Sequence, residues 1–270
     1  MDKSQDELRR LLKRWGWLYR VRPQVLVEPI YRLLGPYGGR SIISHNGAEF
    51  FIDPFTTDGF AIIMDGDYES NLMALMQDKL PKGGIFLDVG ANEGRVSAVA
   101  ARLVGKVGCI IAVEPQSRLQ DLLKINLALN ATGSVHIFHN AIGKNDGDSV
   151  EISLAPTSHH GGSSIVRKYR WSSKRETIST RSIDSVIDEV GCEKIDMMKV
   201  DVEGYEAEVI DSAANSLAAH RINTIALDYH GDILRNRGID PMSIDAMIRK
   251  HGYRLEQGSP LGGYTVYSAC

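Results

Sequence analysis

The sequence predicts an α/β fold in which helices cover both faces of a doubly wound, mostly parallel sheet. Between residues 85 and 251, five short apolar segments with strand character alternate with five helical patterns. The predicted strands are residues 85–89, 109–113, 135–139, 196–200 and 224–229, and the helices are residues 94–104, 117–130, 183–190, 204–214 and 240–251. Such alternation is typical of a parallel sheet that is buried on both faces.

Segments outside this alternation complete the predicted domain. A helix is expected over residues 70–80, and Pro81 ends it. Residues 147–154 read as a strand, and residues 155–176 as a loop rich in histidine, glycine, serine and basic residues. Near the C-terminus, residues 253–255 and 264–267 flank a Gly-Gly pair, which predicts a closing antiparallel pair of strands.

Residues 1–60 are predicted to form an N-terminal extension with a helix and a hairpin, and residues 61–270 the main domain. Residues 4–20 place leucines and a tryptophan at helical spacing, with basic residues between them. Asn46-Gly47 lies between two strand-like segments and suits a two-residue hairpin turn. This basic helix suits a membrane surface or an acidic partner. Packing on the core, or on a second copy in a homo-oligomer, is the simpler interpretation.

Composition limits the possible partners and compartment. A net charge of −3 over 270 residues argues against a dedicated nucleic-acid-binding protein, which needs a basic excess. Three widely separated cysteines suggest neither a disulfide framework nor a zinc site. The sequence shows no secretory signal and no apolar stretch long enough to span a bilayer. We therefore expect a soluble, cytoplasmic protein.

A glycine turn after the first strand is the strongest functional signal. The run Gly90-Ala-Asn-Glu-Gly94 joins that strand to the next helix, where backbone N–H groups can approach a ligand. Glu114 ends the second strand, where nucleotide-binding folds place the carboxylate that accepts hydrogen bonds from the ribose. A dinucleotide site requires a third, central glycine, and this run has none. The ligand is therefore expected to be a nucleoside without phosphates, such as S-adenosylmethionine.

With these residues in view, the chain resembles the FkbM family of S-adenosylmethionine-dependent methyltransferases over about residues 65–231. The resemblance rests on an ordered series of motifs. They are Tyr68-Glu69, Phe86 to Gly94, Val113-Glu114-Pro115, Asn140-Ala141-Ile142-Gly143, Gly161 to Ser164, Ser182-Ile183-Asp184 and, most specifically, Lys199-Val-Asp-Val-Glu-Gly204. The resemblance implies a Rossmann-like class I methyltransferase fold, bound S-adenosylmethionine with S-adenosylhomocysteine as product, and commonly O-methylation of sugar or natural-product hydroxyls. The first 60 residues show no such resemblance.

The cofactor-binding candidates follow from these motifs. Asn140 is placed to meet the adenine edge or to cap its own turn. Asp88 and Asn92 orient the glycine turn or hold the methionine ammonium, and Glu69 closes over the cofactor or starts the following helix. The full set of candidates is Glu69, Asp88, Gly90, Asn92, Gly94, Glu114, Pro115, Asn140 and Ala141.

Two residues at strand ends are candidates for catalysis. Asp201 and His230 follow strands that are predicted on the acceptor side of the sheet. Histidine has the intrinsic pKa of a general base near neutral pH, although His230 can also be a hydrogen-bonded loop residue. Asp201 is a base, a substrate anchor or a cofactor contact, and Glu203 is either a site group or a charge at a helix N-terminus.

The loop at residues 155–176 is expected to be a lid, with a plain exposed insertion as the alternative. His159 and His160, with Glu203, are the predicted substrate-binding residues. A divalent metal is not expected. Asp201, Glu203, Asp228 and His230 follow neighbouring strands and would suit magnesium, but their spacing does not require an ion.

The leading interpretation is an O-methyltransferase that acts on a sugar or glycosylated natural product, with a small molecule as its partner. N-methylation of a small molecule stays open, because the sequence does not identify the acceptor atom. A nucleotide-binding oxidoreductase is disfavoured by the missing third glycine. A non-catalytic domain of the same fold is disfavoured by the intact Gly90, Gly94, Glu114 and Asp201.

Overall fold

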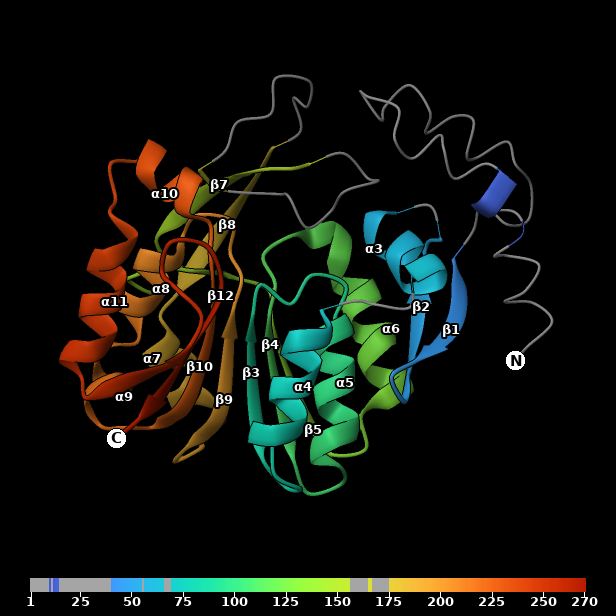
Figure 1. Cartoon of the computed structure of the whole chain (residues 1–270), viewed down its shortest axis with the longest axis horizontal. Helices are drawn as coiled ribbons and strands as arrows, with labels where there is room; N and C mark the ends of the chain where they lie inside the picture. The colour runs from blue at the N-terminus through green and yellow to red at the C-terminus, as the bar shows by residue number, and fades with distance from the viewer. Residues whose placement is uncertain are drawn as a thin grey trace.

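A seven-stranded sheet forms the centre of the molecule (Figure 1). The computed structural model describes residues 10, 12–14, 40–54, 56–65, 69–155, 165–166 and 175–270. The strands run in the order β11-β12-β10-β9-β3-β4-β5. Their bounds are β3 Ile85–Val89, β4 Cys109–Val113, β5 Ser134–Phe138, β9 Ile195–Val200, β10 Ile222–Tyr229, β11 Tyr253–Gln257 and β12 Gly263–Ala269. The five strands from β10 to β5 are parallel, and β12 is antiparallel to both of its neighbours. This confirms the predicted doubly wound sheet with its antiparallel C-terminal pair.

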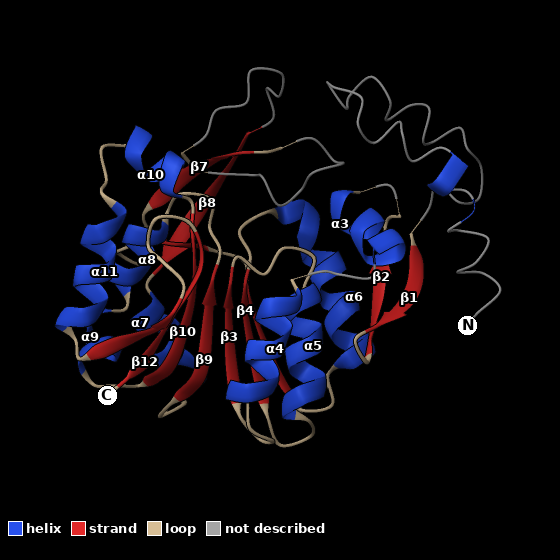
Figure 2. Cartoon of the chain, in the orientation of Figure 1, coloured by secondary structure: helices blue, strands red, loops and turns tan. Residues whose placement is uncertain are grey.

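Helices cover both faces of this sheet (Figure 2). One face carries α4 (Ser70–Lys79), α5 (Arg95–Val104) and α6 (Gln120–Asn130), and the other carries α7 (Ile183–Val190), α8 (Glu206–Ser212), α9 (Ala214–Ala218) and α11 (Pro241–Lys250). Each face has its own buried cluster. Successive strand residues alternate between them, so that Phe86 enters one cluster and Leu87 the other. Burial on both faces explains why the strands read as continuous apolar runs.

Several boundaries differ from the sequence expectation. The helix predicted over residues 204–214 is divided into α8 and α9 at Ala213, and a 3-10 turn, Ser117–Leu119, precedes α6. The sequence missed α10 (Gly231–Asn236), α3 (Thr57–Phe60) and the π-helix η4 (Ala61–Asp65). These elements are short, and they lack the two or more turns of apolar repeat that a helix prediction needs.

A small second sheet lies beside the main one, with strand order β6-β8-β7. It consists of β6 (Ala141–Ile142), β7 (Ser149–Ser153) and β8 (Arg175–Arg181). Strand β7 was predicted, whereas β8 begins inside the segment that was expected to be a loop. Most of that segment, including His159 and His160, lies outside the described residues.

The predicted N-terminal hairpin is confirmed as β1 (Ser41–His45) and β2 (Ala48–Ile52), with Asn46 and Gly47 at positive φ in the turn. It packs on α5 and α6. Buried asparagines of α6 hold its edge: Asn130 and Asn126 accept hydrogen bonds from the backbone N–H groups of Glu49 and Phe51, at 2.8 and 2.7 Å.

The predicted N-terminal helix lies mostly outside the described residues. Arg10 and residues 12–14 are helical, and Leu12 is buried in the core. The domain boundary at residue 60 and a homo-oligomer contact through this helix stay predictions. Within the described ranges, no helix combines the length and apolar character that crossing a membrane requires.

Gly90 directly follows β3 and lies against Asp201, which directly follows β9. Its φ is +81°, and an added Cβ would lie 1.9 Å from the carbonyl oxygen of Asp201. The backbone N–H of Asp201 in turn donates to the carbonyl of Val89 at 3.0 Å. Glycine is therefore required here by the close approach of β3 and β9 as well as by backbone conformation.

Gly90→Ala is expected to destabilise the chain by about 2–5 kcal/mol, because it combines a left-handed backbone conformation with overpacking against the chain itself. Urea unfolding at equilibrium measures this loss. Gly191→Ala is the matched control, since Gly191 also has positive φ (+72°) but would meet no atom within 4 Å. Equal losses in the two variants would show that contact with Asp201 contributes nothing.

Candidate active site

A cavity of about 840 Å³, part of it open to solvent, lies at the carboxyl ends of β3, β4 and β9. The chain extends the sheet from β3 through β4 and β5 on one side, and from β9 through β10 on the other. Such a reversal of strand order is where doubly wound sheets bind their ligands. The predicted residues that line the cavity are Glu69, Gly90, Asn92, Glu114, Pro115, Asn140, Ala141, Asp201 and Glu203.

The glycine turn forms one wall of this cavity. Gly90, Asn92 and Gly94 all have positive φ, and Gly94 is the residue before α5. Gly94 does not line the cavity; an added Cβ there would lie 2.5 Å from Leu123 of α6. Its place in the motif is therefore explained by close packing of two helices and by the left-handed conformation that starts α5.

Glu114 is held at the cavity wall by the backbone. Its two carboxylate oxygens accept hydrogen bonds from the N–H groups of Asn92 and Gln116, both at 2.8 Å. Burial raises the pKa of Glu114 to about 7, and these hydrogen bonds oppose the shift. The side chain of Gln116 also forms a hydrogen bond with this carboxylate. Because a carboxylate has about four acceptor positions, these contacts do not use all of its capacity to accept from a ligand.

The other predicted cofactor residues occupy different positions. Asn140 lines the cavity, and its amide donates to the carbonyl and the hydroxyl of Ser179 at 3.2 and 2.9 Å. Glu69 precedes α4 in a left-handed conformation and accepts a hydrogen bond from Tyr264 at 3.4 Å. Both residues line the cavity and also form hydrogen bonds within the protein. Each can therefore contact the cofactor or have only a local structural role.

Asp88 lies beneath the cavity and does not line it. Ser97 donates to its carboxylate at 2.6 Å, and the ammonium of Lys199 lies 3.3 Å from it. Lys199 also lies 3.6 Å from Asp201 and donates to the carbonyl of Gly90 at 3.0 Å. Burial alone would lower the pKa of Lys199, but the charges of Asp88 and Asp201 outweigh it and raise that pKa. This arrangement places Asp88 as support for the glycine turn.

Asp201 lines the cavity, and His230 lies beside Asp201 without lining the cavity itself. The His230 Nε2 lies 3.9 Å from Asp201 Oδ1 and 3.7 Å from Glu203 Oε2. On its other side, Nδ1 lies 2.7 Å from Oε1 of the fully buried Glu206. Burial alone would lower the pKa of His230, but the hydrogen bond to Glu206 and the nearby carboxylates raise it to about 9.

The raised pKa of His230 differs from the value expected for a general base at neutral pH. The intrinsic pKa of histidine suggested a base that is neutral at physiological pH, whereas the surroundings in the folded chain favour the protonated ring. The sequence pattern identified the residue and its neighbour Asp201. It missed Glu206, although Glu206 lies only two residues after the end of the motif that contains Asp201 and Glu203.

Two polar residues of the site, Lys199 and Glu206, were assigned no role from the sequence. Lys199 belongs to the most specific motif and lines the cavity. Cavity-lining residues that were also not singled out are Arg95, Gln116 and Tyr205. Arg95 and Gln116 lie within two residues of a predicted site residue, and Tyr205 follows Gly204. Their closeness to the motifs in the sequence is the feature by which they could have been identified.

Comparisons with known proteins match this chain to methyltransferases. The family model described as the Methyltransferase FkbM domain matches residues 88–255. Hexuronic acid methyltransferase AglP of Haloferax volcanii is 23% identical over 180 residues, which cover 67% of each chain. The AMB antimetabolite synthetase AmbE of Pseudomonas aeruginosa is 25% identical over 229 residues, which cover 70% of this chain and 10% of AmbE.

Among solved structures, Aeropyrum pernix fibrillarin with natively bound S-adenosyl-L-methionine has a TM-score of 0.44 at 10% identity, covering 86% of this chain and 83% of fibrillarin. TYW2 of M. jannaschii in complex with AdoMet has a TM-score of 0.40 at 14% identity, covering 85% and 84%. These TM-scores are too low to assign a fold, which rests on the strand order described above.

The family match covers more than half of the chain and includes the glycine turn, Glu114 and Asp201. It confirms the predicted family. The chain belongs to the FkbM methyltransferase family.

Proposed function

We propose that the protein transfers a methyl group from S-adenosylmethionine to a hydroxyl of a sugar or a glycosylated small molecule. The observation that supports this most is a single cavity that joins the glycine turn and Glu114 with Asp201 at the end of β9. In a class I methyltransferase the cofactor lies over the first of these strands and the acceptor over the second. The cavity can therefore hold S-adenosylmethionine and the acceptor side by side.

The cofactor half of the cavity suits an adenosyl group. Glu114 lines the cavity with a carboxylate that can accept from ribose hydroxyls, and the apolar side chains of Val113 and Ile142 also line it. A pyrophosphate would instead require bare backbone at the centre of the turn, where Asn92 stands. These features favour S-adenosylmethionine over a dinucleotide.

The acceptor half contains Asp201 and Glu203. In the reaction, a lone pair of the acceptor oxygen forms a bond to the methyl carbon, the carbon–sulfur bond breaks, and its electron pair returns to sulfur as S-adenosylhomocysteine forms. The hydroxyl proton leaves to a nearby base or to water. Alignment of oxygen, methyl and sulfur can supply about 7–11 kcal/mol. We assign this alignment to Asp201, which lines the cavity, together with the adjacent His230.

A sugar acceptor is supported by the relative AglP, which is named as a hexuronic acid methyltransferase. The identity of 23% limits this support to the class of acceptor. Carboxylates and the imidazole that surround Asp201 offer hydrogen-bond partners to a polyhydroxylated ligand.

Glu114→Gln is expected to weaken binding of S-adenosylmethionine by about 10–100-fold, because charge-assisted hydrogen bonds to hydroxyls become neutral ones. Isothermal titration calorimetry measures this, with NAD as a ligand that should give no binding. Exposed Glu151, whose partner is Arg175, provides the control variant Glu151→Gln. Unchanged affinity in Glu114→Gln would remove Glu114 from cofactor binding.

The same affinity is expected to rise with pH through about 7. Below that value Glu114 carries a proton and has fewer acceptor positions, so binding weakens by at most about tenfold per pH unit for one linked proton. Calorimetry between pH 5.5 and 8.5 checks this, and the dependence should disappear in Glu114→Gln. A dependence that persists in this variant would assign it to another group.

Asp201→Ala is expected to lower turnover to S-adenosylhomocysteine by about 100-fold or more, while the affinity for S-adenosylmethionine changes little. The assay uses neutral glycosides, uronic acids and amino sugars as acceptors. Asp211→Asn is the control, since Asp211 pairs with Lys144 on the outside of α8. Near-normal turnover in Asp201→Ala would dismiss Asp201, and preference for amino sugars would favour N-methylation.

A further inference from the structure

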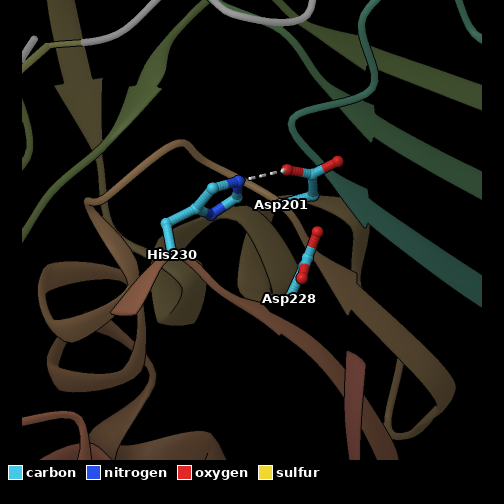
Figure 3. Close-up of side chains that lie close together, drawn as sticks. All are labelled: Asp201, Asp228 and His230. Carbon is cyan, nitrogen blue, oxygen red and sulfur yellow. Dashed lines mark ion pairs between the residues drawn. The ribbon is translucent and has the colours of Figure 1, made fainter. Parts of the chain in front are cut away.

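We propose that Asp201, Asp228 and His230 bind a divalent metal ion at the edge of the cofactor cavity. One potential ligand atom from each residue lies within 4.8 Å of the others. The three side chains come from the ends of the adjacent strands β9 and β10 and converge on one space (Figure 3). A metal was not expected from the sequence, because these residues follow neighbouring strands but their spacing does not require an ion.

The three donor atoms lie up to 4.8 Å apart, slightly farther than one ion requires. Donor atoms that bind the same ion at about 2.0–2.2 Å lie at most about 4.4 Å apart. The residues are partly exposed, with side-chain exposures of 28% for Asp201 and 20% for His230. Side-chain rotations that bring the donor atoms closer by at most about 0.4 Å would close the site.

The imidazole of His230 is already oriented for this role. Glu206 Oε1 lies 2.7 Å from Nδ1 and also accepts a hydrogen bond from the backbone of Gly204 at 2.9 Å. Because Glu206 holds Nδ1, Nε2 is directed toward Asp201. Metal-binding histidines characteristically use their second ring nitrogen in this way, with a carboxylate that fixes the ring.

Negative charge is concentrated at this position. Four carboxylates lie around the imidazole of His230: those of Asp201, Glu203, Glu206 and Asp228. The nearby ammonium of Lys199 lies close to both Asp88 and Asp201. Glu206 is fully buried, and its Oε2 has no hydrogen-bond partner among the described residues. A divalent cation would offset more of the negative charge of these four carboxylates than one proton on His230.

The donor set indicates which cation to test. Carboxylate oxygens suit magnesium and manganese, whereas imidazole suits first-row transition metals. Mn²⁺ accepts both kinds of donor and reports its own binding by electron paramagnetic resonance. Since Asp201 lines the cavity, positions left open on the ion would face an acceptor. This extension rests on the proposed function and favours acceptors with two adjacent oxygens, such as vicinal hydroxyls or a hydroxy acid.

The test is titration of the full chain with Mn²⁺, after dialysis against a chelator and without cofactor or acceptor. We expect one ion per chain. Binding should weaken by more than tenfold in Asp228→Asn and in His230→Gln, and by about 10–100-fold in Glu206→Gln, which retains the ligands but loses the orienting charge. Asp211→Asn on the outside of α8 should bind as the unmodified chain does. Circular dichroism and thermal unfolding select the variants that fold.

Absence of a stoichiometric site in the unmodified chain would overturn the proposal, as would binding that is the same in all folded variants. Failure here is distinguishable from failure of the proposed function. Methyl transfer that continues after chelation, with no Mn²⁺ bound, would reject the metal and retain the methyltransferase. Mn²⁺ bound at Asp228 and His230 without methyl transfer to any sugar would retain the metal and reject the proposed acceptor.

Discussion

The buried ammonium of Lys199 is the interaction on which the arrangement of the site depends. It lies between Asp88 of β3 and Asp201 after β9, and it donates to the carbonyl of Gly90. Lys199 and Asp88 are buried, whereas Asp201 is partly exposed. Removal of the ammonium would leave the buried carboxylate of Asp88 without its cation, which is costly. The two strands that carry the predicted cofactor and acceptor sites therefore end in a fixed relation to each other.

Much of the fold was predictable because it depends on local patterns. The five central strands are buried on both faces, so their sequences are continuous apolar runs. Asn46-Gly47 specifies the turn of the hairpin through its tolerance of positive φ. Helix α10 was missed, because only Ile233 and Leu234 of its six residues are apolar and aliphatic. The break between α8 and α9 lies at Ala213, with no proline or glycine nearby from which it could have been predicted.

The candidate site was predictable in its residues but less so in its contacts. Motif order placed Glu114, Asn140, Asp201 and Glu203 at one cavity, because parallel strands end at the same edge of the sheet. The pairing of His230 with Glu206 depends on how α8 packs beside β10, and no spacing rule gives that distance. Its consequence is a pKa near 9, which differs from the value that the isolated side chain suggests.

Asn126 connects the hairpin to the wall of the cofactor cavity. Its side-chain oxygen accepts from the backbone of Phe51, while its nitrogen donates to the carbonyl of Glu93 inside the glycine turn, at 2.7 Å in both cases. One buried amide thus links the hairpin to the loop at Gly90–Gly94. The backbone of the cavity wall is therefore fixed in part by a contact with residues from the N-terminal part of the chain.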